Sequence, residues 1–292
     1  MKRIGFVGLG SMGLPMATNL GAAGFEVTGF DVRADARHAF ARTGGRAADT
    51  LAEAFAGQDA TILMVVNAAQ AQDILFTQGA LSTLPEGGVV ILMATCPPAA
   101  VQALAAQVEA TGRALVDAPV SGGVVGAEAA SLTIMAAAPR PVLARVKPVL
   151  DALGSKVVVL GDTPGQGATA KAVNQLLCGA HLAIAAEGLS LAEALGVDTA
   201  AMLDILSGSS ASSWMLKDRG PRMMQDEPPV TSAVDIFVKD LGIVLEAGRD
   251  ARVALPMAAT ALQLFLSVSG RGLGAQDDSQ IIAAYRALRG HI

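Results

Sequence analysis

The chain has 292 residues, of which 52% are hydrophobic and only 16% are charged, with a formal net charge of −5. This length suits two domains with separate cores, and the 3% aromatic content favours close-packed helices and parallel strands over a β-sandwich. Lysine and arginine are not clustered, so we expect no nucleic-acid binding. Two cysteines (Cys96 and Cys178) and three scattered histidines fit neither a disulfide framework nor a metal site, so we expect no metal.

Short apolar segments alternate with helical segments over the first half of the chain. Strands are predicted at residues 3–7, 26–30, 60–66, 88–93, 114–118, 132–136 and 156–160, with the first two helices at 12–23 and 34–42. Continuous apolar strands separated by helices indicate a parallel sheet covered on both faces.

The pattern changes at residues 161–167, the Gly/Pro-rich stretch GDTPGQG, which breaks regular structure. One helix of about 40 Å is predicted over 168–195. Further helices are predicted near 198–208, 212–224, 236–250, 256–269 and 278–289, and no strand pattern follows residue 163. We therefore predict a doubly wound α/β domain at 1–163 and an all-helical domain for substrate binding and dimerisation at 164–292.

A glycine-rich motif follows the first predicted strand and opens the first helix. The loop comprises Gly8, Leu9, Gly10, Ser11, Met12 and Gly13, which gives the G-x-G-x-x-G spacing of a dinucleotide-binding, Rossmann-like domain. The helix N-terminus favours a pyrophosphate, and Asp31 ends the second strand where a carboxylate accepts from ribose hydroxyls. Asp31 would repel a 2′-phosphate, so we expect NAD, although Arg33 softens that preference. An ordinary structural turn is the alternative.

The most apolar long run, residues 176–195, has the composition of a membrane span. It contains His181, Glu187 and Glu193, which a bilayer would penalise, so we interpret it as a buried protein helix and expect no membrane partner. The N-terminal residues lack a signal-peptide pattern, and a cytoplasmic location is expected.

Four blocks of sequence, in order, resemble the β-hydroxyacid dehydrogenase family, which includes 3-hydroxyisobutyrate, 6-phosphogluconate and tartronate semialdehyde enzymes. The blocks are FVGLGSMGLPMATNL from residue 6, DAPVSGG at 117–123, GQGATAKAVNQ at 165–175 and FVKDLGI at 237–243. Gln175 departs from the second asparagine of many relatives. Within the family, SSWML at 212–216 and SAVDIFVKDLGIVLE at 232–246 are similar to L-threonate dehydrogenases, which oxidise a sugar acid at C2.

The resemblance implies a role for each matching position. Lys171 would transfer the proton, and Asn174 would hydrogen-bond the substrate. The substrate carboxylate would be held by Ser121, Gly122 and Gly123. The cofactor would be contacted by Val66, Asn67, Thr95 and Lys239. The family thus implies an NAD-dependent hydroxyacid dehydrogenase acting on a small carboxylate-bearing substrate, as in sugar-acid catabolism.

The chemistry of the residues favours the same role for Lys171. A carbinol carbon releases hydride only as its hydroxyl proton is removed, and no histidine lies within the motifs. Burial and a second cation, Lys239, both favour a neutral amine that accepts a proton. Lys171 and Asn174 are three residues apart, so they project from one helical face. The alternative is a lysine that reaches solvent.

Other interpretations stay open at this point. Asn174 can serve as a helix-packing amide, the SGG segment as an ordinary loop, and Lys239–Asp240 as a solvated pair. The roles of His181, Trp214 and Asp240 are undecided. The alternatives in function are a 3-hydroxyisobutyrate dehydrogenase, a tartronate semialdehyde or glyoxylate-type reductase, an imine reductase, and a non-catalytic dinucleotide sensor. In imine reductases the family lysine is usually replaced, which argues against that branch. The long helix is apolar on more than one face, which predicts a homodimer or homotetramer.

Overall fold

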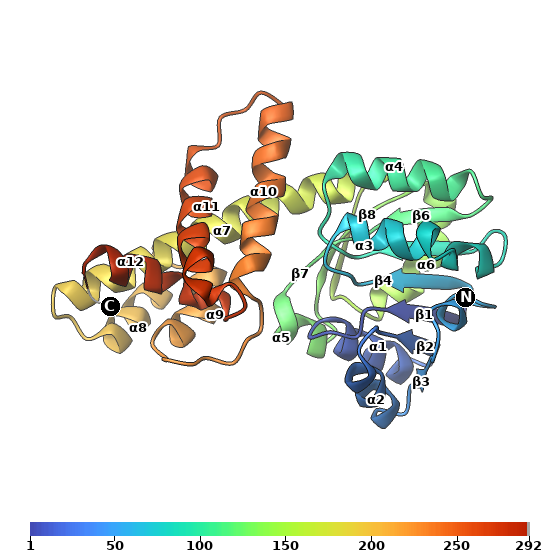
Figure 1. Cartoon of the computed structure of the whole chain (residues 1–292), viewed down its shortest axis with the longest axis horizontal. Helices are drawn as coiled ribbons and strands as arrows, with labels where there is room; N and C mark the ends of the chain where they lie inside the picture. The colour runs from blue at the N-terminus through green and yellow to red at the C-terminus, as the bar shows by residue number, and fades with distance from the viewer. Residues whose placement is uncertain (291–292) are drawn as a thin grey trace. The chain divides into compact units, whose positions relative to one another are not determined.

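The computed structural model describes residues 1–290 and divides the chain into two compact units, Met1–Lys171 and Ala172–Ile292 (Figure 1). The strands of the first unit are β1 Arg3–Val7, β2 Glu26–Phe30, β3 Arg46–Ala47, β4 Ala60–Leu63, β5 Val89–Leu92, β6 Ala114–Asp117, β7 Val120–Ser121, β8 Thr133–Ala137 and β9 Lys156–Gly161. Its α-helices are α1 Gly13–Ala22, α2 Ala34–Arg42, α3 Ala68–Gln72, α4 Pro98–Glu109, α5 Gly123–Glu128 and α6 Arg140–Asp151. Shorter turns of helix are η1 Ala52–Ala54, η2 Asp73–Thr77 and η3 Ala80–Thr83.

The nine strands form one sheet with the order β3-β2-β1-β4-β5-β6-β8-β7, and β9 pairs with β8. The pairs from β3 through β6 are all parallel, which confirms the predicted Rossmann-like, doubly wound domain. The strand order reverses between β1 and β4, where Val7 pairs with Leu63. Ligands of such sheets bind beyond the carboxyl ends of the strands at this reversal, and the glycine loop begins there.

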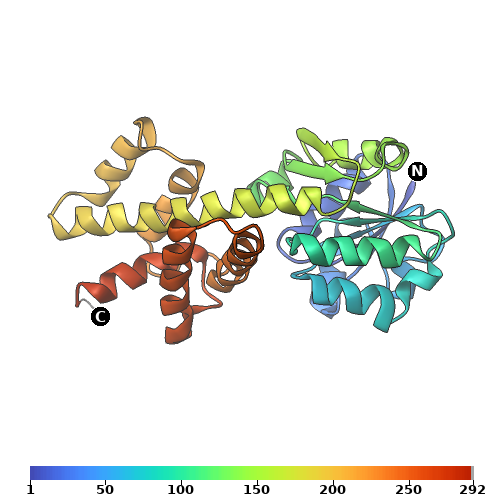
Figure 2. The ribbon, with the colours of Figure 1, turned by 90° about the horizontal axis from the view of Figure 1, so that it is seen from above.

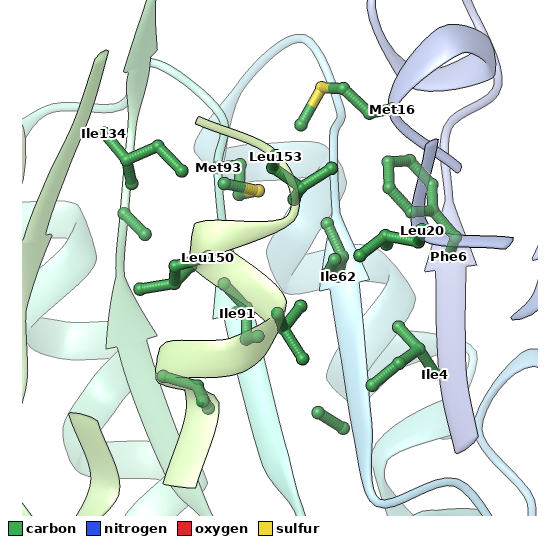
Figure 3. Packing of buried hydrophobic residues seen from close by; sticks show 14 of the residues in the cluster. Ile4, Phe6, Met16, Leu20, Ile62, Ile91, Met93, Ile134, Leu150 and Leu153 are labelled. Carbon is green, nitrogen blue, oxygen red and sulfur yellow. The ribbon is translucent and has the colours of Figure 1, made fainter. Parts of the chain in front are cut away.

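Helices cover both faces of the sheet, and each face has its own apolar core. On one face, α1 and α6 pack over the strands, and Figure 3 shows Met16 and Leu20 beside Ile4 and Phe6. In the same cluster Leu150 of α6 and Leu153, just after that helix, lie over the strands that carry Ile62, Ile91 and Ile134. On the other face, η1, η2, η3 and α4 bury a second cluster that includes Phe55, Leu75, Leu81 and Leu104. Two-sided burial explains why the central strands are continuous apolar runs.

The structure adds two strands that the sequence pattern did not reveal, β3 and β7, each only two residues long. It also ends β4 at Leu63 instead of Val66. The N–H of Val66 bonds to the side chain of Gln70, 2.9 Å away, so this residue no longer joins the ladder. The sheet is mixed at its far edge, because β8 pairs antiparallel with both β6 and β7.

The second unit is built from helices, as predicted. The helices after β9 are α7 Gln166–Ala194, whose first six residues belong to the first unit, α8 Thr199–Gly208, α9 Trp214–Met223, α10 Val234–Asp250, α11 Pro256–Val268, η4 Ser269–Leu273, η5 Asp278–Ile281 and α12 Ile282–Leu288. Within residues 1–290, the only strand-like pairing after β9 is an isolated bridge between Ala233 and Asp277. The last predicted helix begins as a tight 3₁₀ turn, because Asp277 caps it by accepting from the N–H of Ser279.

Helix α7 is one unbroken helix of 29 residues, drawn in yellow in Figure 2. Among the described residues it is the one helix long and apolar enough to cross a membrane, and half of its most apolar window is buried in protein. Leu182, Ala186 and Leu189 are fully buried in the core of the second unit. One face of the helix therefore packs in the core of the second unit, and the rest of its apolar surface is exposed.

Candidate active site

The glycine loop at the end of β1 needs its glycines for three different reasons. Gly8 has a φ of +97°, and a Cβ there would lie 2.2 Å from the carbonyl oxygen of Met64. A Cβ on Gly13 would lie 1.8 Å from the carbonyl oxygen of Gly8, so Gly13 lets α1 begin against the strand. A Cβ on Gly10 would meet nothing nearer than the Arg33 side chain at 4.0 Å, which leaves room for a phosphate to approach the backbone.

The rest of the loop leaves the start of α1 available to an anion. No side chain caps this helix at Met12, so its first N–H groups keep their capacity to donate. Ser11 is exposed and Met12 is half-buried, whereas the Leu9 side chain is buried in the core. Leu9 therefore contributes its backbone to the loop, while its side chain belongs to the core. The donors and the open space beside Gly10 fit the pyrophosphate of a dinucleotide.

Asp31 connects the ends of β1 and β2. One of its oxygens accepts from the N–H of Leu9 at 2.8 Å, and the other accepts from the N–H of Arg33 at 2.9 Å. The Arg33 side chain adds an ion pair at 3.4 Å. Each carboxylate oxygen has two acceptor sites, so these bonds leave capacity for ribose hydroxyls. Asp31 thus fixes the glycine loop in addition to the cofactor role predicted for it.

The loops after β4 and β5 carry the other predicted cofactor residues. Val66 is exposed, and Asn67 caps α3 by accepting from the N–H of Gln70 at 2.9 Å. Thr95 lies between β5 and α4. The carboxyl ends of parallel strands share one edge of the sheet, so Val66, Asn67 and Thr95 lie at the same edge as Gly8.

The Ser121-Gly122-Gly123 segment forms a tight bend between β7 and α5. Gly122 has a φ of +132° and Gly123 one of +61°, conformations that other residues rarely adopt. The side-chain amide of Asn19 on α1 donates to the carbonyl of Ala127 at 2.7 Å and so ties α5 to the helix that follows the glycine loop. This anchoring by Asn19 was not predicted, although the residue lies inside the FVGLGSMGLPMATNL block.

Asp117, at the end of β6, is a second residue that sequence reasoning missed. Its side chain is fully buried, and Oδ2 accepts from the N–H groups of Gly165 and Ala168, each at 2.8 Å. A Cβ on Gly167 would lie 3.0 Å from this carboxyl group, so glycine is required there. Burial raises the pKa of Asp117 to about 6, against the opposing effect of these N–H donors. An acid directly after an apolar strand, inside the DAPVSGG block, was the available signal.

Asp117 therefore secures the first turn of the helix that carries Lys171. Lys171 lies in the second turn of α7 and is only 7% exposed, so it is not a lysine that reaches solvent. Asn174 follows on the same helix and is half-buried. The structure thus places the predicted base on a rigid element whose start is tied to the sheet.

In the second unit, α10 carries Lys239 and Asp240. Asp240 contacts Gln175, the residue of α7 that follows Asn174. Lys239 Nζ lies 2.7 Å from Asp240 Oδ1, and Gln175 Nε2 donates to Asp240 Oδ2 at 2.5 Å. Asp240 is 2% exposed, so this ion pair is not a solvated surface pair. The side-chain amide of Asn174 donates to Gln175 Oε1 at 2.9 Å. Gln175, noted in the sequence only as a departure from relatives, is the centre of this chain of bonds.

Trp214 and His181, whose roles were also undecided, lie outside this chain of bonds in the second unit. Trp214 is half exposed, and the guanidinium of Arg219 lies 5.6 Å from its ring centre. His181 is half-buried. Cys96 and Cys178 form no disulfide. A search of the described part of the chain finds no group of three or more His, Cys, Asp or Glu arranged to hold a metal.

The sheet topology and the glycine loop define a dinucleotide-binding domain of the Rossmann class. The family model described as "NAD binding domain of 6-phosphogluconate dehydrogenase" matches residues 3–161. The model described as "NAD-binding of NADP-dependent 3-hydroxyisobutyrate dehydrogenase" matches residues 165–285. Together they cover nearly the whole chain.

Known proteins agree with these matches. The chain is 39% identical, over 97% of its length and 96% of the relative's, to the L-threonate dehydrogenase of Cupriavidus necator. It is 30% identical, over 99% of both chains, to the 2-hydroxy-3-oxopropionate reductase of Escherichia coli. A crystal structure of 3-hydroxyisobutyrate dehydrogenase from Salmonella typhimurium superposes with a TM-score of 0.92 and 38% identity, covering 97% of this chain and 99% of that one. The chain therefore belongs to the 3-hydroxyisobutyrate dehydrogenase-like family. Because its relatives include L-threonate dehydrogenases, it is an NAD-dependent hydroxyacid dehydrogenase.

Proposed function

We propose that the enzyme oxidises a small sugar acid, L-threonate, at C2 to the 2-oxo acid 2-dehydro-L-erythronate. Several relatives named L-threonate dehydrogenase, at 35–39% identity over nearly the whole chain, support this substrate. The observation that carries the chemistry is the buried Lys171 on α7. We place the reaction in the cytoplasm.

Lys171 acts as the general base in this proposal. Bound NAD would supply the acceptor for the hydride of the carbinol carbon. The neutral amine of Lys171 takes the proton of the substrate hydroxyl, and the same group returns a proton to the carbonyl oxygen in the reverse direction. Its burial excludes the water that would otherwise compete for the amine.

The other predicted residues bind and orient. Ser121 supplies a hydroxyl, and the two glycines after it supply N–H groups without side chains, which suits a carboxylate. Asn174 contacts the substrate one turn beyond Lys171. Gly8, Gly10, Gly13 and the first turn of α1 hold the pyrophosphate, and Asp31 accepts from the ribose. The cofactor is also contacted by Val66, Asn67, Thr95 and Lys239.

A panel of acids assayed for NADH formation tests the substrate. We expect the highest kcat/KM with L-threonate among four-carbon sugar acids. The alternative substrate is 3-hydroxyisobutyrate, favoured by the Salmonella typhimurium structure of that name at 38% identity. Tartronate semialdehyde is the other family alternative and would be detected as NADH consumption. If either of these two compounds has a higher kcat/KM than L-threonate, it becomes the proposed substrate. If the enzyme turns over none of the acids tested, the proposed enzymatic role is contradicted.

The proposal includes a homodimer or homotetramer formed through α7. Four large apolar side chains of this helix and that of Leu195, directly after its end, are at least half exposed, and their separations of four and seven residues place them on one face. They are Val173, Leu177, Ile184, Leu191 and Leu195. An apolar stripe of this length on a helix indicates a protein partner, and a second copy of the chain is the simplest one. Sedimentation is expected to show a dimer or tetramer that Ile184→Glu weakens, and a stable wild-type monomer at micromolar concentration would contradict it.

A further inference from the structure

The amide of Asn174 has a defined orientation in this structure, and that orientation determines which substrate group it can bind. An asparagine side chain donates from Nδ2 and accepts at Oδ1, so its two ends recognise opposite partners. At Asn174 the donor end is used within the protein. Its Nδ2 donates to Gln175 Oε1 at 2.9 Å and to Cys178 Sγ at 3.3 Å.

The orientation begins at Asp240, on α10. Lys239 Nζ lies 2.7 Å from one oxygen of this carboxylate, and an ionised carboxylate can only accept hydrogen bonds. Gln175 must therefore present its Nε2 to the other oxygen, which it does at 2.5 Å. Its Oε1 then faces the other way and can only accept, so Asn174 must donate to it.

Burial keeps this chain of bonds from rearranging. Gln175 is 7% exposed and Asp240 is 2% exposed, so water is not available as a substitute partner. Reversing the Gln175 amide would place Oε1 against the carboxylate and Nε2 against the Asn174 amino group, which breaks two buried hydrogen bonds at once. The outcome is that Asn174 commits its donor end, Nδ2, to the protein and can meet a substrate only with Oδ1, an acceptor with two lone pairs.

An acceptor suits some substrate groups and not others. It repels a carboxylate, and it also repels the carbonyl oxygen that forms at the reacting carbon when the hydroxyl is oxidised. A hydroxyl that is not oxidised can donate to it throughout the reaction. We propose that Gln175 is a positioning residue that fixes Asn174 as an acceptor, and that Asn174 thereby selects polyhydroxy acids with a hydroxyl next to the reacting carbon. The inference rests on the proposed substrate-binding role of Asn174 and on oxidation at C2.

The test compares L-threonate with 2,4-dihydroxybutanoate, which lacks only the hydroxyl at C3, as substrates of the NAD-saturated enzyme. The wild type is expected to prefer L-threonate in kcat/KM by about 10²-fold, because the analogue lacks the hydroxyl that donates to this partly buried acceptor. Gln175→Met removes the constraint on Asn174 and is expected to reduce the preference to about 10-fold or less. Because the constraint acts on the bond to the C3 hydroxyl, kcat/KM should fall more for L-threonate than for the analogue. Gln263→Met, at an exposed glutamine of α11, is the matched control and should keep the wild-type ratio.

A second variant guards against a misfolded Gln175→Met protein. Asp240→Asn lets residue 240 donate as well as accept, so the chain of hydrogen bonds can run in either direction. The kcat/KM preference for L-threonate over the analogue should therefore fall as it does in Gln175→Met. A wild type with equal kcat/KM for the two acids would overturn the inference, as would a ratio that both variants leave unchanged. An enzyme that oxidises 3-hydroxyisobutyrate but neither test acid would contradict both the inference and the proposed substrate. Turnover of both acids without preference would contradict only the inference.

Discussion

The two units of this chain use polar groups in different ways. In the first unit the interior consists of apolar strands and helices, and polar groups gather in the loops at the carboxyl ends of the strands. In the second unit charged side chains lie inside the packing. Arg219 pairs with the fully buried Asp278, and Arg222 pairs with the fully buried Asp277. The first unit therefore depends on backbone geometry, and the second depends on specific side-chain partners.

This contrast predicts where single substitutions do most damage. Removing one member of a buried ion pair leaves an uncompensated charge, which costs more than losing a surface pair. A small sheet-edge loop tolerates changes that preserve its backbone conformation. The second unit should thus be the more sensitive one to charge-removing substitutions.

The largest expected effect is on Arg219. Arg219→Ala leaves Asp278 buried without its cation and removes the contact with the Trp214 ring. We expect the free energy of unfolding to fall by about 3–5 kcal/mol, measured by chemical denaturation. The matched control in the first unit is Lys147→Ala, which breaks an exposed pair with Asp151 and should cost less than about 1 kcal/mol. Equal losses of unfolding free energy in the two variants would contradict the proposed difference between the units.

Asp117 is the exception in the first unit, because it is a buried carboxyl group held only by backbone N–H donors. Its pKa is raised from 3.8 to about 6, so folding disfavours the ionised form. The stability it contributes is present below pH 4 and is lost as the pH rises through about 6. Relative to Asp117→Asn, the wild type should lose about 2 kcal/mol of unfolding free energy between pH 4 and pH 7.

The control for this pH dependence is Gln107→Ala, at an exposed glutamine of α4, which removes no titratable group. Its difference from the wild type should stay flat over the same pH range. A flat difference for Asp117→Asn as well would show that Asp117 titrates near its ordinary value and that its burial does not disfavour the charge.

A smaller effect is expected at Asp31. Asp31→Ala should weaken NAD binding more than NADP binding, because the carboxylate accepts from ribose hydroxyls and repels a phosphate. The variant also loses the bond to the N–H of Leu9, so Asp31→Asn, which keeps an acceptor, isolates the charge. Its NAD/NADP selectivity should fall by about 10-fold, in direct binding measurements. Asp35→Asn, at an exposed acid of α2, should leave the selectivity unchanged, and an unchanged ratio in both would refute the role of Asp31.

The same contrast explains how much could be predicted from the sequence. Strand and helix patterns are local, so the sheet, the glycine loop and even the bounds of α2 were predicted correctly. The order of the four family blocks marked the positions of Lys171, Asn174 and the SGG bend. Contacts between distant residues leave no local pattern. Gln175 and Asp240 are 65 residues apart, and Arg219 and Asp278 are 59 apart.

Short elements and backbone anchors were missed for a related reason. β3 and β7 are two residues long, too short for any periodicity. The role of Asp117 depends on N–H groups of the residues that begin α7, and a sequence does not show which backbone groups a buried acid will meet.

The most direct test of the central claim is the pH-dependent turnover of Lys171 variants. Lys171→Ala should lower kcat for L-threonate, or for the best acid of the panel, by about 10²–10⁴-fold and leave NAD binding nearly intact. Lys171→Arg should fail almost as badly, because a guanidinium stays protonated and cannot act as a base. In the wild type the oxidation rate should rise with pH as the amine becomes neutral. Near-normal kcat in either variant would contradict the account and leave Lys171 as a buried structural lysine.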